Sequence, residues 1–227
     1  MDDPGVRERL VAAGVELIAD RGAAAVSLRE IARAAGVSHG APRRYFPTHR
    51  DLLAGIAAEG FAQLESRVRV ALAGASDAAA QLAALARAYV DFAAAERGMF
   101  ELMFRHDLLR GNGIGLREHG QSLFRLLVAL LTAASPGDAE VLAGAFWANL
   151  HGIAQLRAWG SLRVALGDDD VEPLLAAALA AYLPPASADV PPASADLSAA
   201  FADVPQASVD LLLASADVPT ASAEGVR

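Results

Sequence analysis

The amino-acid sequence predicts an all-α fold: a three-helix domain containing a helix-turn-helix unit, then a helical bundle and a disordered tail, with about nine helices in total. Three observations support this prediction. Large apolar residues recur every three or four positions through most of the first 183 residues, which is the period of helices packed on one face. Pairs of a hydroxyl residue and an acid three positions later begin two of the predicted helices. The chain ends in a low-complexity repeat.

The first predicted helix covers residues 6–21 and ends at Gly22. Its apolar side chains recur at helical spacing, so we expect them to close the core of the first domain. The residues on this face are Val6, Leu10, Ala13, Leu17 and Ile18.

Residues 27–46 have the pattern of two short helices joined by a sharp turn. Ser27 with Glu30 forms a capping box at the start of the first helix. Gly36 stands where a helix end needs a left-handed residue, and Ser38 is expected to cap the second helix. The small and apolar residues have the spacing of a helix-turn-helix unit: Ile31, Ala32, Ala35, Gly36 and Val37.

The second helix of this unit is predicted to enter the major groove of DNA. Its exposed face offers the donors of His39, Arg43 and Arg44 and the aromatic hydroxyl of Tyr45. An alternative interpretation is that the two arginines form only a solvated face. The turn spacing ahead of them favours the DNA-binding interpretation.

A long helix is predicted from Thr48 to about Ala73, with Asp51 as the second member of its capping box. His49 and Arg50 lie in its first turn, where DNA phosphates would pass if the groove assignment is right. An ordinary surface first turn is the alternative. This helix belongs to both predicted domains, so a tilt at its far end would move the reading helix. Its inner side carries Leu52, Leu53, Ile56, Phe61, Leu64 and Val68.

Three stretches of the first domain match a known family: A-A-G-V-E-L-I-A-D-R-G at 12–22, I-A-R-A-A-G-V-S at 31–38 and R-Y-F-P-T-H-R-D-L-L at 44–53. Through them, residues 4–64 resemble the DNA-binding domain of the TetR family of transcriptional regulators. The resemblance implies a homodimer, most often a repressor, that binds double-stranded DNA at a palindromic operator. The candidate DNA-binding residues are Ser27, Arg29, Ser38, His39, Arg43, Arg44, Tyr45, His49 and Arg50.

The recognition helix departs from the family pattern. His39 follows the capping serine where members of the family usually have Lys, and Ala41, Pro42 and Arg43 replace the common Thr-Leu-Tyr. Pro42 has no amide hydrogen and takes the place of an apolar core residue. We therefore expect the helix start to shift or distort by about one residue. The phosphate contact of the family's tyrosine would then pass to Arg43 or Arg44.

Residues 65–183 are predicted to form a second, entirely helical domain. Its helices are expected from Ser76 to about Gly98, at 99–104, at 116–134, from Pro136 to about Leu162, and from about 170 to 183. The G-x-G-x-G spacing in 110–115 is interpreted as a loop, because no strand precedes it as a phosphate cradle would need. The three acids at 168–170 suit a helix N-terminus better than a metal site.

The helix after Pro136 carries Trp147, His151 and Gly152, which loosely resemble the Trp-His-Gly signature of one TetR C-terminal subfamily. Gly152 in mid-helix predicts that another helix crosses closely there. A ligand pocket is predicted among the bundle helices, lined by apolar and aromatic side chains. The candidate ligand-binding residues are Tyr89, Phe92, Phe100, Met103, Phe104, Phe124, Trp147 and His151. For each of them, a plain core position is the alternative, and for His151 the alternative is a core or interface position.

Composition narrows the class of protein further. The chain has 227 residues, no cysteine and a net charge of -8, with all 19 basic residues arginine. Residues 1–50 carry a net charge of +2 and residues 186–227 a net charge of -5, so the basic surface lies at the DNA-binding end. Without cysteine there is no disulfide and no thiolate chemistry. No apolar run is long enough to span a membrane, and we expect a cytoplasmic protein.

The leading hypothesis is a dimeric repressor that an apolar or aromatic small molecule releases from its operator. The dimer seam is expected on the helices at 136–162 and 170–183. One alternative is a DNA-binding regulator without a small-molecule ligand, and a less favoured one is an all-α enzyme. No cofactor and no metal site is expected. The tail at 184–227, with its proline-containing seven-residue repeat, is predicted to be disordered.

Overall fold

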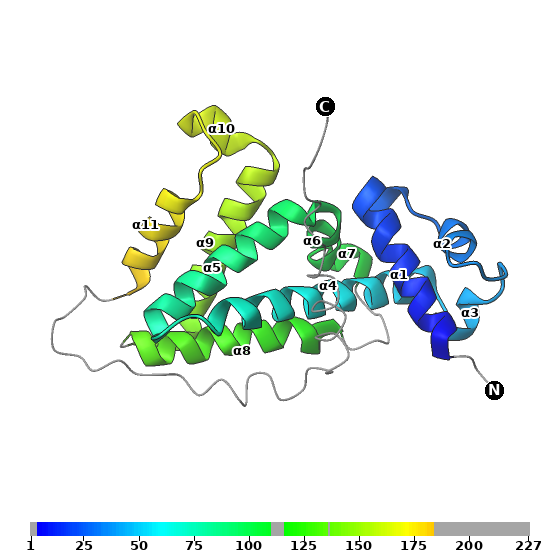
Figure 1. The fold of residues 1–227 in the computed structure, drawn as a ribbon, viewed down its shortest axis with the longest axis horizontal. Coiled ribbons are helices and arrows are strands. Elements are labelled where there is room, and N and C mark those ends of the chain that lie inside the picture. The colour runs from blue at the N-terminus through cyan, green and yellow to red at the C-terminus, as the bar shows by residue number, and fades with distance from the viewer. Residues whose placement is uncertain (1–3, 110–115, 136, 184–227) are drawn as a thin grey trace, which may run out of the picture.

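A computed structural model describes residues 4–109, 116–135 and 137–183. These residues form eleven α-helices and one 3-10 turn, and the described part of the chain contains no strand. Helices α1–α3 lie at one end of the molecule, and α10 and α11 lie at the other, with α4 running from beside α1–α3 into the helices that lie between the two ends (Figure 1). The predicted all-α class is confirmed. The count exceeds the expected nine because short helices add to the long ones.

Three helices build the first unit: α1 (Pro4–Arg21), α2 (Leu28–Ala34) and α3 (Pro42–Tyr45). A 3-10 turn at Ala23–Ala25 connects α1 to α2 after Gly22, whose φ of 74° ends α1 as expected. The core is apolar because each helix turns one face inward. Its fully buried side chains include Leu10, Ile18, Ile31 and Phe46.

Helix α4 (His49–Leu72) joins the first unit to the bundle. The Thr48 hydroxyl accepts from the Asp51 amide at 3.1 Å and donates to the Asp51 carboxylate at 2.7 Å, while that carboxylate accepts from the Thr48 amide at 3.0 Å. This capping box was predicted and is confirmed. The boundary expected after residue 64 falls inside this continuous helix, so both parts share α4.

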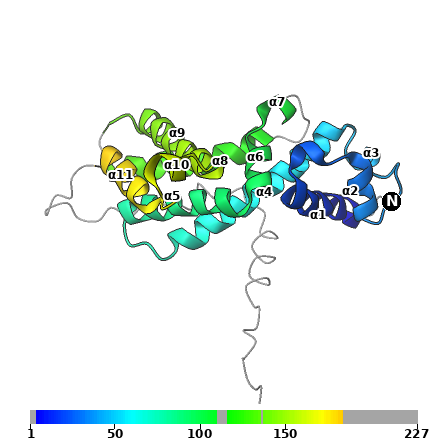
Figure 2. The same ribbon diagram turned by 90° about the horizontal axis from the view of Figure 1, so that it is seen from above.

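In the bundle, α5 (Ala78–Ala95) and α8 (Leu116–Ala134) pack against α4, and α9 (Ala139–Ala158) packs against α5 and α8. Helix α11 (Glu172–Tyr182) covers α9 and α5 at the far end (Figure 2). The buried residues of the bundle and of the first unit form one hydrophobic core. Its fully buried side chains in the bundle include Leu82, Phe92, Leu102 and Phe146.

The predicted bounds of two helices are wrong. Gly98 does not end the helix that begins near Ser76, because α5 stops at Ala95 and Gly98 lies inside α6 (Arg97–Met103). The helix expected from Pro136 to Leu162 instead begins at Ala139, after an Asp138 cap, and ends at Ala158.

Short segments complete the bundle: α7 (His106–Leu109) follows α6, and α10 (Ser161–Leu166) follows α9 after Gly160, whose φ is 73°. Asp170 accepts from the Glu172 amide at 3.0 Å, so one of the three acids holds the start of α11 as expected. The loop expected at 110–115, Pro136 and the tail expected to be disordered at 184–227 lie outside the described residues.

No single helix in the described part of the chain is long and apolar enough to cross a membrane, although residues 120–134 and 139–158 together have that length and apolar composition as a bent pair. The same part of the chain holds no group of three acids or histidines placed to bind a metal ion.

Candidate nucleic-acid interface and ligand cavity

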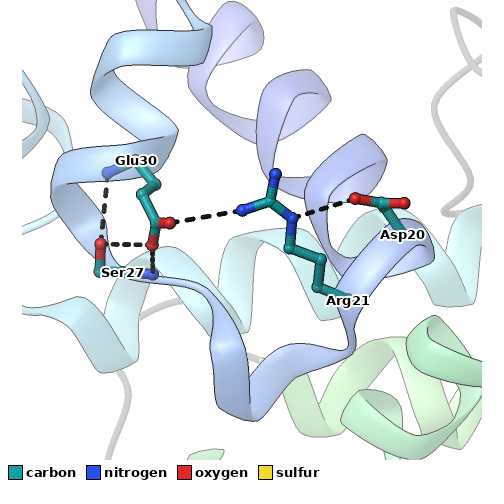
Figure 3. A network of polar contacts seen from close by, with 4 residues as sticks. All are labelled: Asp20, Arg21, Ser27 and Glu30. Atoms are coloured by element: carbon teal, nitrogen blue, oxygen red, sulfur yellow. Dashed lines mark hydrogen bonds and ion pairs between the residues drawn. The ribbon is translucent and has the colours of Figure 1, made fainter.

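The start of α2 is held by a polar network that also ties α2 to α1 (Figure 3). The Ser27 hydroxyl accepts from the Glu30 amide at 3.3 Å and donates to the Glu30 carboxylate at 2.7 Å. The Ser27 amide also donates to that carboxylate at 3.0 Å, which completes the predicted capping box. Arg21 at the end of α1 reaches Glu30 at 3.5 Å and Asp20 at 3.0 Å. The hydrogen bond from the Ser27 side chain is the largest cause of a lowered pKa of Glu30, so the carboxylate stays ionised.

The turn after α2 has the geometry that the sequence predicts. Gly36 adopts a φ of 66°, a left-handed conformation that glycine takes without a steric penalty. The Gly36 amide donates to the Arg33 carbonyl at 3.2 Å, and the Val37 amide donates to the Ala32 carbonyl at 3.0 Å. These bonds satisfy the end of α2 and turn the chain sharply toward α3.

The start of the recognition helix differs from the prediction. Helix α3 begins at Pro42 and is a single turn, so Ser38 does not cap it and the shift is three residues instead of one. The Ala41 amide donates to the Ser38 carbonyl at 3.0 Å, which makes residues 38–41 a turn. Pro42 is buried at the first helical position, where a missing amide hydrogen costs nothing.

The candidate DNA-binding side chains face solvent with one exception. The exposed ones are Ser27, Arg29, Ser38, His39, Arg43, Arg44, His49 and Arg50, whereas Tyr45 is half-buried and packs against the core. Residues 27–50 hold five arginines and one glutamate, so this surface has a net charge of +4 with histidine neutral. Arg7 is used differently, because its guanidinium lies 5.4 Å from the centre of the Phe46 ring.

A cavity of about 540 Å³ lies in the second half of the molecule, between α4, α5, α8 and α9, with α6 and α7 at one side. Five of the eight predicted ligand-binding residues line it: Tyr89, Met103, Phe104, Phe124 and Trp147. Its volume is that of a pocket for a drug-sized molecule.

The other three predicted residues lie behind the lining. Phe92 is fully buried and packs under the guanidinium of Arg67 at 5.0 Å, so it is a core residue. Phe100 is 3% exposed and stacks on the His151 ring at 5.4 Å. His151 itself supports the wall, because its Nδ1 lies 2.9 Å from the Tyr89 hydroxyl.

Three polar side chains form a hydrogen-bonded cluster at the wall of the cavity: Tyr89, Trp147 and His151. The indole N–H of Trp147 donates to the Tyr89 hydroxyl at 3.3 Å, and the same hydroxyl is within hydrogen-bond distance of His151. Burial raises the pKa of Tyr89, and burial lowers the pKa of His151. Both side chains are therefore neutral at neutral pH.

Sequence reasoning missed much of the lining, above all the contribution of α4. Phe61, Leu64 and Val68 follow one another at helical spacing along α4 and face the cavity. That spacing identified them as inward-facing, but it cannot distinguish a residue that borders a void from one packed in a core. The remaining missed residues are Leu85, His106, Leu109, Gly120, Gln121, Leu123, Leu127 and Leu150.

Helix α9 has a second apolar face that nothing in the described subunit covers. Val141 is 65% exposed and Trp159 is 71% exposed, and Gly152 between them has no atom within 4 Å of the position its Cβ would take. The close helix crossing expected at Gly152 is therefore absent within the described subunit. We call this face the α9 stripe; its residues are Val141, Ala145, Ala148, Gly152, Leu156 and Trp159.

Comparison with protein families finds two matches along the chain. Residues 10–56 match the family model of bacterial regulatory proteins of the tetR family, and residues 82–182 match the tetracyclin repressor-like C-terminal domain. No curated protein matches the chain significantly in sequence.

Solved structures share the fold over most of the chain. A protein of unknown function from Rhodococcus sp. RHA1 is 35% identical, with a TM-score of 0.68, over 78% of this chain and 93% of that one. The multidrug binding protein EbrR, complexed with imidazole, is 26% identical, with a TM-score of 0.55, over 82% and 99%. The TetR transcriptional regulator SCO0520 from Streptomyces coelicolor is 29% identical, with a TM-score of 0.50, over 79% and 99%.

Proposed function

We propose, from the membership of this chain in the TetR family of DNA-binding transcriptional regulators, that it is a homodimeric repressor released from its operator by an apolar or aromatic small molecule. The observation that carries the proposal is that the helix-turn-helix unit and the cavity share α4. A molecule in the cavity therefore touches the same helix that supports the recognition helix.

The DNA-binding half of the proposal rests on the surface of the first unit. Arg43 and Arg44 project from the single turn of α3, and His49 and Arg50 begin α4 only three residues after α3 ends. Cations at the N-terminus of a long helix favour phosphate contact, because the helix end itself attracts anions. We place the phosphate backbone along these residues and the major groove against α3.

The dimer is supported by the α9 stripe. Six apolar or small residues in line along one helix form an exposed apolar face, which is costly in water unless a partner covers it. Alanine and glycine at its centre allow a second helix to approach closely. One α3 turn reads few base pairs, so two copies related by a two-fold axis would supply the affinity of a specific complex.

Release follows from the position of the cavity on α4. Phe61, Leu64 and Val68 lie on the second half of this helix, and the Thr48 cap lies at its DNA-proximal end. A ligand that binds better to one orientation of α4 shifts the population toward that orientation. The loss of DNA affinity can be no larger than the ligand's preference between the two states. Such a regulator works beside the chromosome, so we place it in the cytoplasm.

The proposal is tested by isolating genomic fragments that the purified protein retains and measuring their affinity against salt. Each phosphate contact contributes close to one unit to the slope of log affinity against log salt, so a steep slope is expected. A panel of apolar aromatic compounds is then added to the complex. Release of DNA by any of them, at concentrations that leave the fold intact, supports the ligand-gated function.

Two other results identify the alternatives. Salt-dependent binding that no compound in the panel relieves supports a regulator that works without a small-molecule ligand. Failure to retain any fragment at low salt overturns the DNA-binding proposal and makes an all-α enzyme the next hypothesis to test.

A further inference from the structure

The described lining of the cavity brings few polar atoms into an apolar space. Four lining residues carry nitrogen or oxygen in their side chains, and three of these are exposed to solvent: His106, Gln121 and Trp147. The fourth is Tyr89, which is only 6% exposed. A ligand enclosed by this wall therefore meets the Tyr89 hydroxyl as its buried hydrogen-bonding partner.

The hydroxyl of Tyr89 has one position left for a ligand. A phenol has one proton and two lone pairs, and the indole N–H of Trp147, which can only donate, occupies one lone pair. If the Tyr89 proton points to His151 Nδ1, the second lone pair is free to accept. If His151 carries its proton on Nδ1 and donates it, the Tyr89 proton is free to donate. The imidazole tautomer thus decides which kind of group the hydroxyl offers.

The ring of His151 is held in place next to the Tyr89 hydroxyl, whichever imidazole tautomer is present. It stacks on Phe100 at 5.4 Å and meets the edge of Phe104 at 4.7 Å. Tyr89 packs edge-on against Phe100 at 5.4 Å as well. A rigid aromatic frame keeps the imidazole within reach of the hydroxyl, and only a proton has to move when the tautomer changes.

We propose that Tyr89, held by Trp147 and His151, is the polar anchor of the cavity and selects neutral aromatic ligands that carry a hydroxyl or a carbonyl oxygen. This inference rests on the proposed ligand-gated function and adds the class of ligand. Both acceptors and donors are accommodated, because the tautomer of His151 changes the role of the hydroxyl. A charged ligand is disfavoured, since the polar groups at this wall are themselves neutral.

The test uses four probes that share one ring system: naphthalene, 1-naphthol, 1-acetylnaphthalene and 1-naphthoate. Their affinities for the full chain are measured by calorimetry at neutral pH, together with those for Tyr89→Phe. Tyr182→Phe is the matched control, because Tyr182 packs against Phe146 and does not line the cavity. We expect the two neutral oxygenated probes to bind about five- to tenfold more tightly than naphthalene, as one buried hydrogen bond allows. Tyr89→Phe should remove this advantage and leave naphthalene unchanged, whereas Tyr182→Phe should preserve it.

The outcomes distinguish a failure of the Tyr89 proposal from a failure of the proposed ligand-gated function. If naphthalene binds as tightly as the oxygenated probes, or if their advantage survives in Tyr89→Phe, the anchor is overturned and the ligand-gated function still stands. Tightest binding of 1-naphthoate overturns the preference for neutral ligands. If no probe binds, the anchor and the ligand-gated function fall together. Should Tyr89→Phe fail to fold, Tyr89→Met takes its place, because it also lacks the hydroxyl, and it should likewise remove the advantage of the oxygenated probes.

Discussion

The arginines near α3 differ in what already engages them. Arg21 pairs with Asp20 and Glu30, and the guanidinium of Arg7 packs on Phe46, so both serve the fold. Arg43 and Arg44 are exposed and make no ion pair within the described part of the chain. Their charge therefore remains available for a phosphate, which gives Arg44 a clear expected role.

Substituting Arg44→Ala should weaken binding to specific and random duplexes alike. One lost phosphate contact lowers the salt slope by roughly one for each bound subunit. The control is Arg87→Ala, which removes the same charge from an arginine paired with Glu172 at 2.6 Å in the bundle. Fluorescence anisotropy across a salt series measures both variants. A salt slope identical to that of the unmodified protein would rule out the phosphate contact.

Among the helices, α3 is the one whose start depends on a single residue, Pro42. Pro42 lies at its first position, and the Phe46 amide donates to the Pro42 carbonyl at 2.7 Å, so the turn closes around the proline. The ring fixes φ near the helical value, which lowers the entropy of the unfolded chain without straining the folded one.

Replacing Pro42 with Ala should therefore destabilise the protein. We expect a loss of about 0.4–1 kcal/mol from the unfolded-state entropy alone, and a larger loss from the buried ring atoms. Urea unfolding monitored by circular dichroism provides the measurement. An increase in stability would show instead that the proline strains this turn.

Local signals made the element starts predictable. The hydroxyl and acid pairs at Ser27 and Thr48 act over three residues, and Gly36 acts at its own position, so the sequence alone identifies them. Ser38 resembles a cap by the same logic, but the proline four residues later sets the start of α3. Gly98 resembles a helix end, yet its role depends on another helix that comes close in space.

The lining of the cavity was predictable only in part, because it too depends on packing between distant helices. Aromatic residues marked the correct helices, but sequence spacing cannot show which side chains border an empty space. Phe92 and Phe104 differ in this respect although both are apolar and belong to the same region. Phe92 is covered by Arg67, whereas Phe104 reaches the cavity. The distinction arises from packing between helices that are distant in sequence.

At the scale of the whole molecule, α9 presents two different faces. Its Trp147 and His151 hold Tyr89 at the cavity, while Gly152 lies on the α9 stripe. The three residues of the Trp-His-Gly signature thus lie on one helix, with Trp147 and His151 at the cavity and Gly152 at the proposed dimer seam.

Substituting Gly152→Leu should weaken the dimer without harming the subunit. The side chain meets open space in the isolated subunit, and replacing a glycine in mid-helix favours the helix. In a close seam the same side chain keeps the partner away, so we expect at least a roughly tenfold rise in the dimer dissociation constant. Analytical ultracentrifugation would compare it with Ala94→Leu, at an exposed position on α5. Equal dimer strength in both variants would place the seam elsewhere.

Another prediction at this scale concerns the close packing of α6 against the end of α1. A side chain on Gly98 would collide with the Ile18 carbonyl oxygen and approach the Gly22 Cα to 3.5 Å, both of which are backbone atoms that cannot rotate away. Gly98→Ala should cost about 1–3 kcal/mol of stability and alter DNA affinity. The control is Gly120→Ala in α8, where the new atom makes only an ordinary 3.7 Å contact with Phe61. If both variants unfold at the same temperature, the two helices are free to separate.

The contact at Gly98 also restricts how such proteins can be recombined. An engineer who grafts this DNA-reading module onto a different sensor domain would transplant α1 with the Ile18 carbonyl in place. The incoming sensor then needs a residue without a side chain at the matching position of its own α6. A hybrid that lacks it would hold two well-folded halves in the wrong mutual orientation, and it would bind its inducer without transmitting the signal.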